Sequence, residues 1–301
     1  MPVSDITFDS GGISLAGQLW VPAEEPENGL PAVAISGPLT GVKDQVIGYY
    51  ARLLAEHGLV ALAFDPRNWG ESQGGPRNHE DPHGKIADLR DAISWLRAQP
   101  GIDPGRVGLV GVCAGGSYAL NAAAFDPRVS AVACVAAAYN SPAAMRSQFG
   151  EEMYWSLLGQ LMEAAERERE SGEAAYLPAV AAEGPALMPI VEAFEYYGTD
   201  RNPSAVWENR ATVASQRELL TFDALPAADF LERTALLVVH GTTDAFFPPE
   251  AAQAIYERAA GPREIDWVET TTHIDLYDQP RCVEPAAGKV AAFMHAHLGS
   301  A

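Results

Sequence analysis

Three residues that lie far apart in the chain carry the side chains of a nucleophile, an acid and a base: Cys113, Asp244 and His273. A thiol that attacks a carbonyl carbon needs a base to take or hold its proton, and that base needs an acid to orient it. Cys113 is the centre of Gly-Val-Cys-Ala-Gly at 111–115. It takes the place of serine in the G-x-S-x-G nucleophile turn, and the chain order nucleophile, acid, base is the order expected with that turn.

The residues around Cys113 predict the local structure that this chemistry requires. A β-branched run at 107–110 precedes the pentapeptide and an alanine-rich stretch at 117–124 follows it, which predicts a strand, a tight turn and a helix. The two flanking glycines have no Cβ atom that would clash in so sharp a turn. The turn is expected to lift the sulfur above the end of the strand, at a helix N-terminus whose partial positive charge favours a thiolate.

The base and the acid have competitors in the sequence. Asp244 and His273 each follow a predicted strand, so we expect both in loops at the carboxyl edge of the sheet. Asp275 is the alternative acid, but it is too close in sequence to His273 to reach the far ring nitrogen comfortably. The other six histidines lie in predicted helices, at a strand end or in a long loop, and are His57, His79, His83, His240, His295 and His297.

A tetrahedral intermediate requires two hydrogen-bond donors for its oxyanion. The backbone N–H of Ala114, directly after the nucleophile, is expected to be one. The turn-rich loop Gly-Pro-Leu-Thr-Gly at 37–41 follows a predicted strand and is expected to supply the other. Because Pro38 has no N–H, we expect Leu39 to donate, with the Thr40 hydroxyl as the alternative.

The elements that must position these residues alternate along the chain. Apolar strands and amphipathic helices follow one another after an opening hairpin, which predicts a mostly parallel, doubly wound sheet with helices on both faces. The alternation lapses between 141 and 224, where we expect helices and no strand. The sequence therefore predicts an α/β core at 1–140 and 225–301 and a helical lid at 141–224. Part of the lid is expected to line an apolar substrate pocket.

Several motifs along nearly the whole chain resemble those of α/β-hydrolases. They are GVKDQ at 41–45, FDPR at 64–67, GES at 70–72, GVCAGG at 111–116, EYY at 195–197, LTFD at 220–223, HGTTD at 240–244 and THIDLYD at 272–278. The nearest group is the dienelactone-hydrolase-like set that includes fungal polyketide transferases. This resemblance implies an α/β-hydrolase fold with the triad Cys113, Asp244 and His273. Gly37 stands where many members of the group carry a histidine before the oxyanion loop.

Composition excludes several classes of function. The chain has 301 residues, with 40 acidic and 20 basic residues that give a formal charge of −20. Such a charge repels nucleic acid and anionic lipid, so neither is expected as a partner. No apolar run is long enough to span a bilayer and no secretory signal is evident, so we expect a cytoplasmic protein. The three cysteines show no disulfide or metal-ligand spacing, so we predict no metal and no cofactor.

These observations predict an enzyme that acts on a small-molecule acyl substrate. The first hypothesis is a hydrolase that cleaves an ester, lactone or thioester through an acyl-cysteine intermediate. The alternative is an acyltransferase that passes the acyl group to an alcohol, amine or thiol. A second alternative is a non-catalytic binding protein on the same fold. The sequence identifies neither the acyl group nor the acceptor, and it leaves open whether the chain forms a homodimer.

Overall fold

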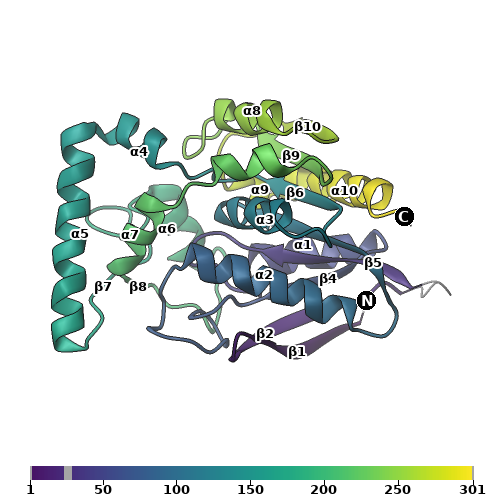
Figure 1. Cartoon of the computed structure of the whole chain (residues 1–301), viewed down its shortest axis with the longest axis horizontal. Helices are drawn as coiled ribbons and strands as arrows, with labels where there is room; N and C mark the ends of the chain where they lie inside the picture. The colour runs from purple at the N-terminus through teal and green to yellow at the C-terminus, as the bar shows by residue number, and fades with distance from the viewer. Residues whose placement is uncertain (1, 24–28, 300–301) are drawn as a thin grey trace.

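A central sheet of eight strands runs through the computed structural model, which describes residues 2–23 and 29–299 (Figure 1). The strand order is β1-β2-β4-β3-β5-β6-β9-β10, and every pair from β4 to β10 is parallel, while β1 and β2 pair antiparallel at one edge. The strands are β1 (Val3–Ser10), β2 (Ile13–Trp20), β3 (Leu30–Ser36), β4 (Val60–Phe64), β5 (Ile102–Val112), β6 (Ala131–Val135), β9 (Ala235–Gly241) and β10 (Arg263–Val268). The predicted mostly parallel sheet and opening hairpin are confirmed.

Helices cover both faces of this sheet. One face carries α1 (Val46–Glu56) and α10 (Pro280–His297), which also contact each other. The other face carries α2 (Pro82–Arg97), α3 (Ala114–Ala124) and α8 (Pro249–Arg258). The short 3-10 helix η1 (Leu225–Phe230) contacts both α3 and α8. The structure is therefore the doubly wound α/β fold that the sequence predicts.

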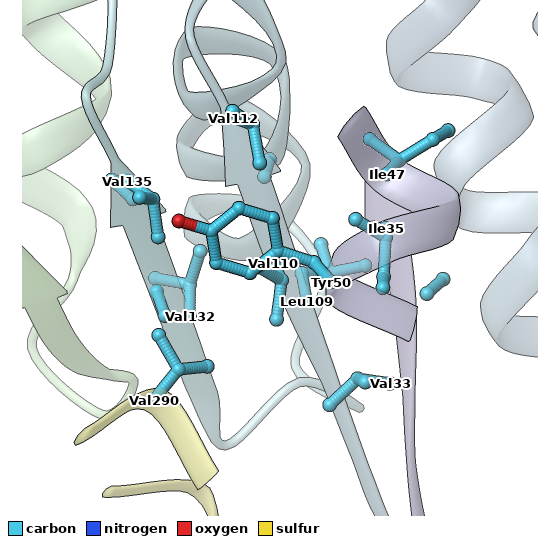
Figure 2. Close-up of a cluster of buried hydrophobic side chains, with 14 of the residues drawn as sticks. Val33, Ile35, Ile47, Tyr50, Leu109, Val110, Val112, Val132, Val135 and Val290 are labelled. Carbon is cyan, nitrogen blue, oxygen red and sulfur yellow. The ribbon is translucent and has the colours of Figure 1, made fainter. Parts of the chain in front are cut away.

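The core next to α1 is built from valine, isoleucine and leucine side chains of β3, β5 and β6 (Figure 2). These strands are buried on both faces, which explains why they appear in the sequence as continuous apolar runs. Tyr50 of α1 lies among these side chains, and its hydroxyl donates a 2.9 Å hydrogen bond to the carbonyl of Leu276. Leu276 belongs to α9 (Asp275–Asp278), a four-residue helix that the sequence analysis missed. This hydrogen bond fixes the segment after His273 to the core.

The segment 141–224 lies outside the main sheet, and we call it the inserted segment. It contains α4 (Pro142–Phe149), α5 (Glu151–Ser171), α6 (Val191–Tyr197) and α7 (Ala214–Thr221), and α5 stands at one end of the molecule in Figure 1. Its two ends meet, because the N–H of Ala224 donates to the carbonyl of Asn140 at 2.9 Å. Its treatment as a separate lid domain stays a prediction.

The expectation of no strand in this segment is wrong. Two antiparallel strands of two residues each, β7 (Tyr176–Leu177) and β8 (Ala211–Thr212), pair with each other there. A strand of two residues is too short to show an alternating pattern in the sequence. In the part of the chain that the structure describes, none of the helices combines the length and the apolar character needed to cross a bilayer.

Candidate active site

The loops that carry the predicted site residues meet at the carboxyl edge of the sheet. Cys113 joins β5 to α3, Asp244 follows β9, His273 follows β10, and the loop 37–41 follows β3. Parallel neighbours place their carboxyl ends at the same edge, where sites in such sheets form. A cavity of about 450 Å³ opens there, and Cys113, His273 and Leu39 line it.

Cys113 occupies a strained backbone corner. Its φ of 55° and ψ of −124° are uncommon for a residue that has a side chain. A Cβ atom built on Gly111 would lie 2.2 Å from the carbonyl oxygen of Gly115, and one built on Gly115 would lie 2.2 Å from that of Ser36. Both glycines are therefore required for the turn, as their spacing predicts. Cys113 itself is 6% exposed and precedes the first residue of α3, so its sulfur lies near the helix N-terminus.

Asp244 and His273 form a buried hydrogen-bonded pair. The Nδ1–H of His273 donates to Asp244 Oδ2 at 2.6 Å. The other carboxylate oxygen, Oδ1, accepts the backbone N–H groups of Phe246 and Phe247, each at 2.9 Å. Burial would raise the pKa of Asp244, but the hydrogen bonds with His273 and the backbone outweigh it and lower that pKa. Asp244 is therefore ionised and oriented toward the imidazole.

The imidazole of His273 is held in its charged form. Burial by itself would lower the pKa of His273, but hydrogen bonds with Asp244 and Cys113 outweigh burial and raise that pKa to about 10. The rings of Phe246 and Phe247 approach the imidazole edge-on, with centroids 5.2 and 5.5 Å away. An imidazolium next to the sulfur is the arrangement that keeps a thiol nucleophile reactive.

A fourth group at this position was missed by the sequence analysis. The hydroxyl of Tyr277, which also lines the cavity, lies 3.1 Å from Nε2 of His273, the ring nitrogen that does not bond to Asp244. Tyr277 follows His273 by four residues and belongs to the short helix α9. His273 lies two residues before α9 begins, so a separation of four residues, about one helical turn, was the available signal.

The alternative acid has a different partner. Asp275 Oδ2 accepts hydrogen bonds from the backbone N–H and the hydroxyl of Thr271, at 2.7 and 2.9 Å. Asp275 therefore closes the loop that carries His273, while Asp244 contacts the imidazole. His240 is fully buried at the end of β9, and its Nε2–H donates to the carbonyl of Phe247 at 2.9 Å. Its role is structural, since it shapes the turn after Asp244.

The loop 37–41 presents Leu39 to the cavity. In the described residues, the backbone N–H of Leu39 makes no hydrogen bond. The neighbouring Thr40 has a φ of 63°, a conformation that is strained for a β-branched residue. Its N–H donates to Glu80 at 3.2 Å and its hydroxyl accepts from Trp207 at 3.4 Å. Thr40 is fully buried away from the cavity, so Leu39 is the better placed of the two expected donors.

Glu80 holds this loop in place, and the sequence analysis missed it. Its carboxylate is fully buried and also accepts the hydroxyl of Tyr118 at 3.0 Å, with the ammonium of Lys85 at 2.6 Å. Removing one partner from such a buried network leaves an uncompensated charge. The strained Thr40 conformation therefore persists because Glu80 accepts its N–H, while Lys85 of α2 and Tyr118 of α3 hold the Glu80 carboxylate in place.

Comparison with known proteins identifies the family of this chain. Residues 11–275 match the family model described as X-Pro dipeptidyl-peptidase (S15 family). The chain belongs to this S15 family. A crystal structure of the hypothetical protein PA2218 from Pseudomonas aeruginosa is similar, with 31% identity, a TM-score of 0.88 and coverage of 98% of this chain and 94% of that one.

Relatives whose names state a fold or an activity are also similar to this chain. The crystal structure of the α/β-hydrolase GrgF from a Penicillium species has 27% identity and a TM-score of 0.83, with 99% of each chain covered. The thiohydrolase aneE of Aspergillus aculeatus is 29% identical over 91% of this chain and 86% of its own length. This S15-family chain is thus an α/β-hydrolase with polyketide-transferase and thiohydrolase relatives, as its motifs predict.

The walls of the cavity come mainly from the inserted segment. They are largely apolar, with three carboxamide side chains, and include Met145, Phe149, Leu157, Leu187, Met188, Ile190, Leu219, Leu220, Asn140, Gln148 and Gln216. Within the described residues, no Asp, Glu, Lys or Arg lines this cavity. Phe149 is 44% exposed, so the cavity extends from the buried Cys113 to the surface.

Proposed function

We propose that this chain is a cysteine-dependent acyl-transfer enzyme that cleaves an ester, lactone or thioester. Cys113 is the nucleophile, His273 the base and Asp244 the orienting acid. The observation that carries the proposal is the buried hydrogen bond of 2.6 Å between His273 and Asp244. His273 and Cys113 line the same cavity. Nucleophile, base and orienting group in this order are the parts of a catalytic triad.

The reaction follows from these positions. The Cys113 thiolate attacks the carbonyl carbon, so that a C–S bond forms and the carbonyl π pair moves onto oxygen. The N–H groups of Leu39 and Ala114 bind this oxyanion. When the intermediate collapses, the leaving group takes the proton from Nε2 of His273 and departs, leaving an acyl-cysteine. His273 then takes a proton from water, which attacks the acyl carbon. The C–S bond breaks with its electron pair on sulfur, so the carboxylic acid leaves and Cys113 is again a thiolate.

An uncharged acyl group suits the cavity better than a dipeptide does. A dipeptidyl substrate has a free amino terminus, whose positive charge must be paired when it is buried. In the described residues no carboxylate lines the cavity walls to pair with it. The relatives named as a thiohydrolase and polyketide transferases favour thioesters as the substrate class.

Transfer to an acceptor other than water is the second candidate. A thioester prefers thiol and amine acceptors over water more than an oxygen ester does. His273 is 4% exposed and Cys113 is 6% exposed, so an acyl group that fills the cavity would limit the access of bulk water to the acyl-cysteine. Product analysis with added alcohols, amines and thiols separates the two candidates, because free acid as the only product with every acceptor excludes transfer.

The test of the proposed function combines turnover with intact mass. Wild type, incubated with a panel of activated esters and acyl thioesters, is expected to turn over and to carry an acyl adduct. Cys113→Ala is expected to lose both, with turnover reduced by at least about 10⁴-fold. Cys134→Ala is the control, because Cys134 is a buried cysteine of β6 that does not line the cavity. A Cys113→Ala protein as active as wild type would indicate a different nucleophile or a binding protein.

A further inference from the structure

Tyr197 has a buried hydroxyl with no partner. It is the last residue of α6 in the inserted segment and is 5% exposed. Its hydroxyl makes no hydrogen bond to any part of the chain that the structure describes. Burying an unpaired hydroxyl is unfavourable, so such a group calls for an explanation. Tyr197 lines the cavity that also contains Cys113 and His273, which makes a bound substrate the natural partner.

The hydroxyl lies beside the loop that carries Leu39. A Cβ atom built on Gly41, at the end of that loop, would lie 3.5 Å from the Tyr197 oxygen. The ring is fixed in this position because it stacks on Trp207, with centroids 5.5 Å apart, and meets the edge of Tyr196 at 4.7 Å. Trp207 also donates to the hydroxyl of Thr40 at 3.4 Å. The inserted segment thus contacts the oxyanion loop through two neighbouring aromatic residues.

A phenol at this place is a donor and not an anion. Burial raises the pKa of Tyr197 well above its ordinary value, and its neighbours Tyr196, Cys113 and Glu80 raise that pKa further. The hydroxyl therefore keeps its proton at neutral pH. It can donate a hydrogen bond to an oxygen that gains negative charge, as an oxyanion-hole side chain does.

We propose that Tyr197 is a catalytic residue whose hydroxyl donates a hydrogen bond to the substrate carbonyl oxygen. The proposal rests on the proposed function of Cys113. When the C–S bond forms, the carbonyl π pair moves to oxygen, and Tyr197 stabilises that charge together with the N–H groups of Leu39 and Ala114 while keeping its own proton. When the intermediate collapses, the pair reforms the C=O bond and the leaving group departs with the proton of His273. The oxyanion hole then consists of two backbone N–H groups at the sheet edge and one side-chain hydroxyl from the inserted segment.

The experiment compares Tyr197→Phe with Tyr196→Phe. The second variant removes the same atom from the adjacent residue, whose hydroxyl accepts from Asn202 and which does not line the cavity. With an acyl thioester as substrate, Tyr197→Phe is expected to lower kcat/KM about 10²-fold, mainly through kcat, because an oxyanion donor acts in the transition state. Tyr196→Phe is expected to stay within about threefold of wild type.

Two reagents separate an oxyanion donor from a structural tyrosine. Iodoacetamide alkylates Cys113 by displacement at a saturated carbon, so no oxyanion forms and the alkylation rate of Tyr197→Phe is expected to equal that of wild type. A trifluoromethyl ketone forms an oxyanion adduct on the sulfur, and its inhibition is expected to weaken by the same factor as kcat/KM.

Three results would overturn the proposal. Turnover of Tyr197→Phe within about threefold of Tyr196→Phe would remove the hydroxyl from the reaction while the proposed function stands. An equal loss of alkylation and turnover would show that Tyr197 acts on the sulfur or on its accessibility. A wild-type chain without turnover or acyl adduct would overturn the proposed function, and the role of Tyr197 with it.

Discussion

The strand-end loops and the inserted segment hold their residues by different means. At the sheet edge, hydrogen bonds and close backbone contacts fix each group, as in the 2.6 Å bond between His273 and Asp244 or the packing of Gly115 on Ser36. In the inserted segment, α4 has no buried residue, and only Tyr154 and Leu161 are buried among the 21 residues of α5. Elements with so few buried contacts open more easily than a core does.

This contrast separates chemistry from selectivity. The groups that we propose for bond making sit on rigid strand ends, where small displacements are costly. Part of the cavity wall sits on α4 and α5, the lightly packed helices of the inserted segment, where side chains can vary without disturbing the sheet. Tyr197 and Trp207 connect the two regions, because both contact the loop 37–41. Four predictions test the contrast, beginning with the largest effect.

Asp244→Asn is expected to lower kcat/KM by about 10⁴-fold. An amide carries no charge to stabilise the imidazolium of His273, and it can present an N–H where the ring needs an acceptor. Steady-state kinetics with an acyl thioester measure the effect. Asp275→Asn is the matched control. Its kcat/KM is expected to fall by less than about tenfold, because Asp275 accepts a hydrogen bond from Thr271 and does not contact the imidazole. Equal losses in the two variants would return Asp275 to consideration as the acid.

A pair of glycine substitutions is expected to change the free energy of unfolding in opposite directions. Gly115→Ala is expected to destabilise by more than about 4 kcal/mol, because its Cβ would lie 2.2 Å from a backbone oxygen. Gly159→Ala lies within α5 and its Cβ would meet nothing within 4 Å, so it is expected to stabilise that helix by about 0.5–1 kcal/mol. Denaturant unfolding measures both. Wild-type stability in Gly115→Ala would refute the strained corner.

The charge on His273 predicts how stability depends on pH. Because its pKa is raised from 6.5 to about 10 in the fold, the native state keeps a proton that the unfolded chain loses between these values. The contribution of His273 to stability is complete below about pH 6.5 and decreases as pH rises toward 10, with a slope of up to about 1.4 kcal/mol per pH unit. The free energy of unfolding should be measured for wild type and His273→Gln across this pH range, and the difference between the two proteins is expected to decrease as pH rises. A constant difference would indicate a neutral imidazole.

Leu219→Ala is expected to change selectivity with little change in catalysis. Leu219 of α7 lines the cavity, so its truncation enlarges the apolar wall and should favour a longer or branched acyl group by about tenfold or less in kcat/KM. Competition between acyl thioesters of different length measures the shift. Met153→Ala is the control, because Met153 is 62% exposed on α5 and does not line the cavity. A loss of kcat for all substrates would mean that α7 also positions the reacting groups.

Local sequence patterns predicted most of the fold and the residues that lie in the loops at the carboxyl edge of the sheet. Some features depend only on neighbours in the sequence, such as the glycines around Cys113 and the missing N–H of Pro38. The positions of Asp244 and His273 follow from the direction of the strands that precede them. Glu80 was missed because its contact with Thr40 spans 40 residues and depends on how the loop folds back. The role of Tyr197 was missed because an aromatic residue in a helical stretch is more often a packing residue. The strands of β7 and β8 are too short for any periodicity to show.

The single hydrogen bond between Ala224 and Asn140 closes the neck of the inserted segment, so the chain leaves and rejoins the sheet at one point. A loop with joined ends can be exchanged, lengthened or shortened while the strand ends stay where they are. Grafting the corresponding stretch of a relative that keeps a tyrosine at the position of Tyr197 should therefore transfer the preference for an acyl group, while the sulfur, the imidazole and the carboxylate continue to come from the host.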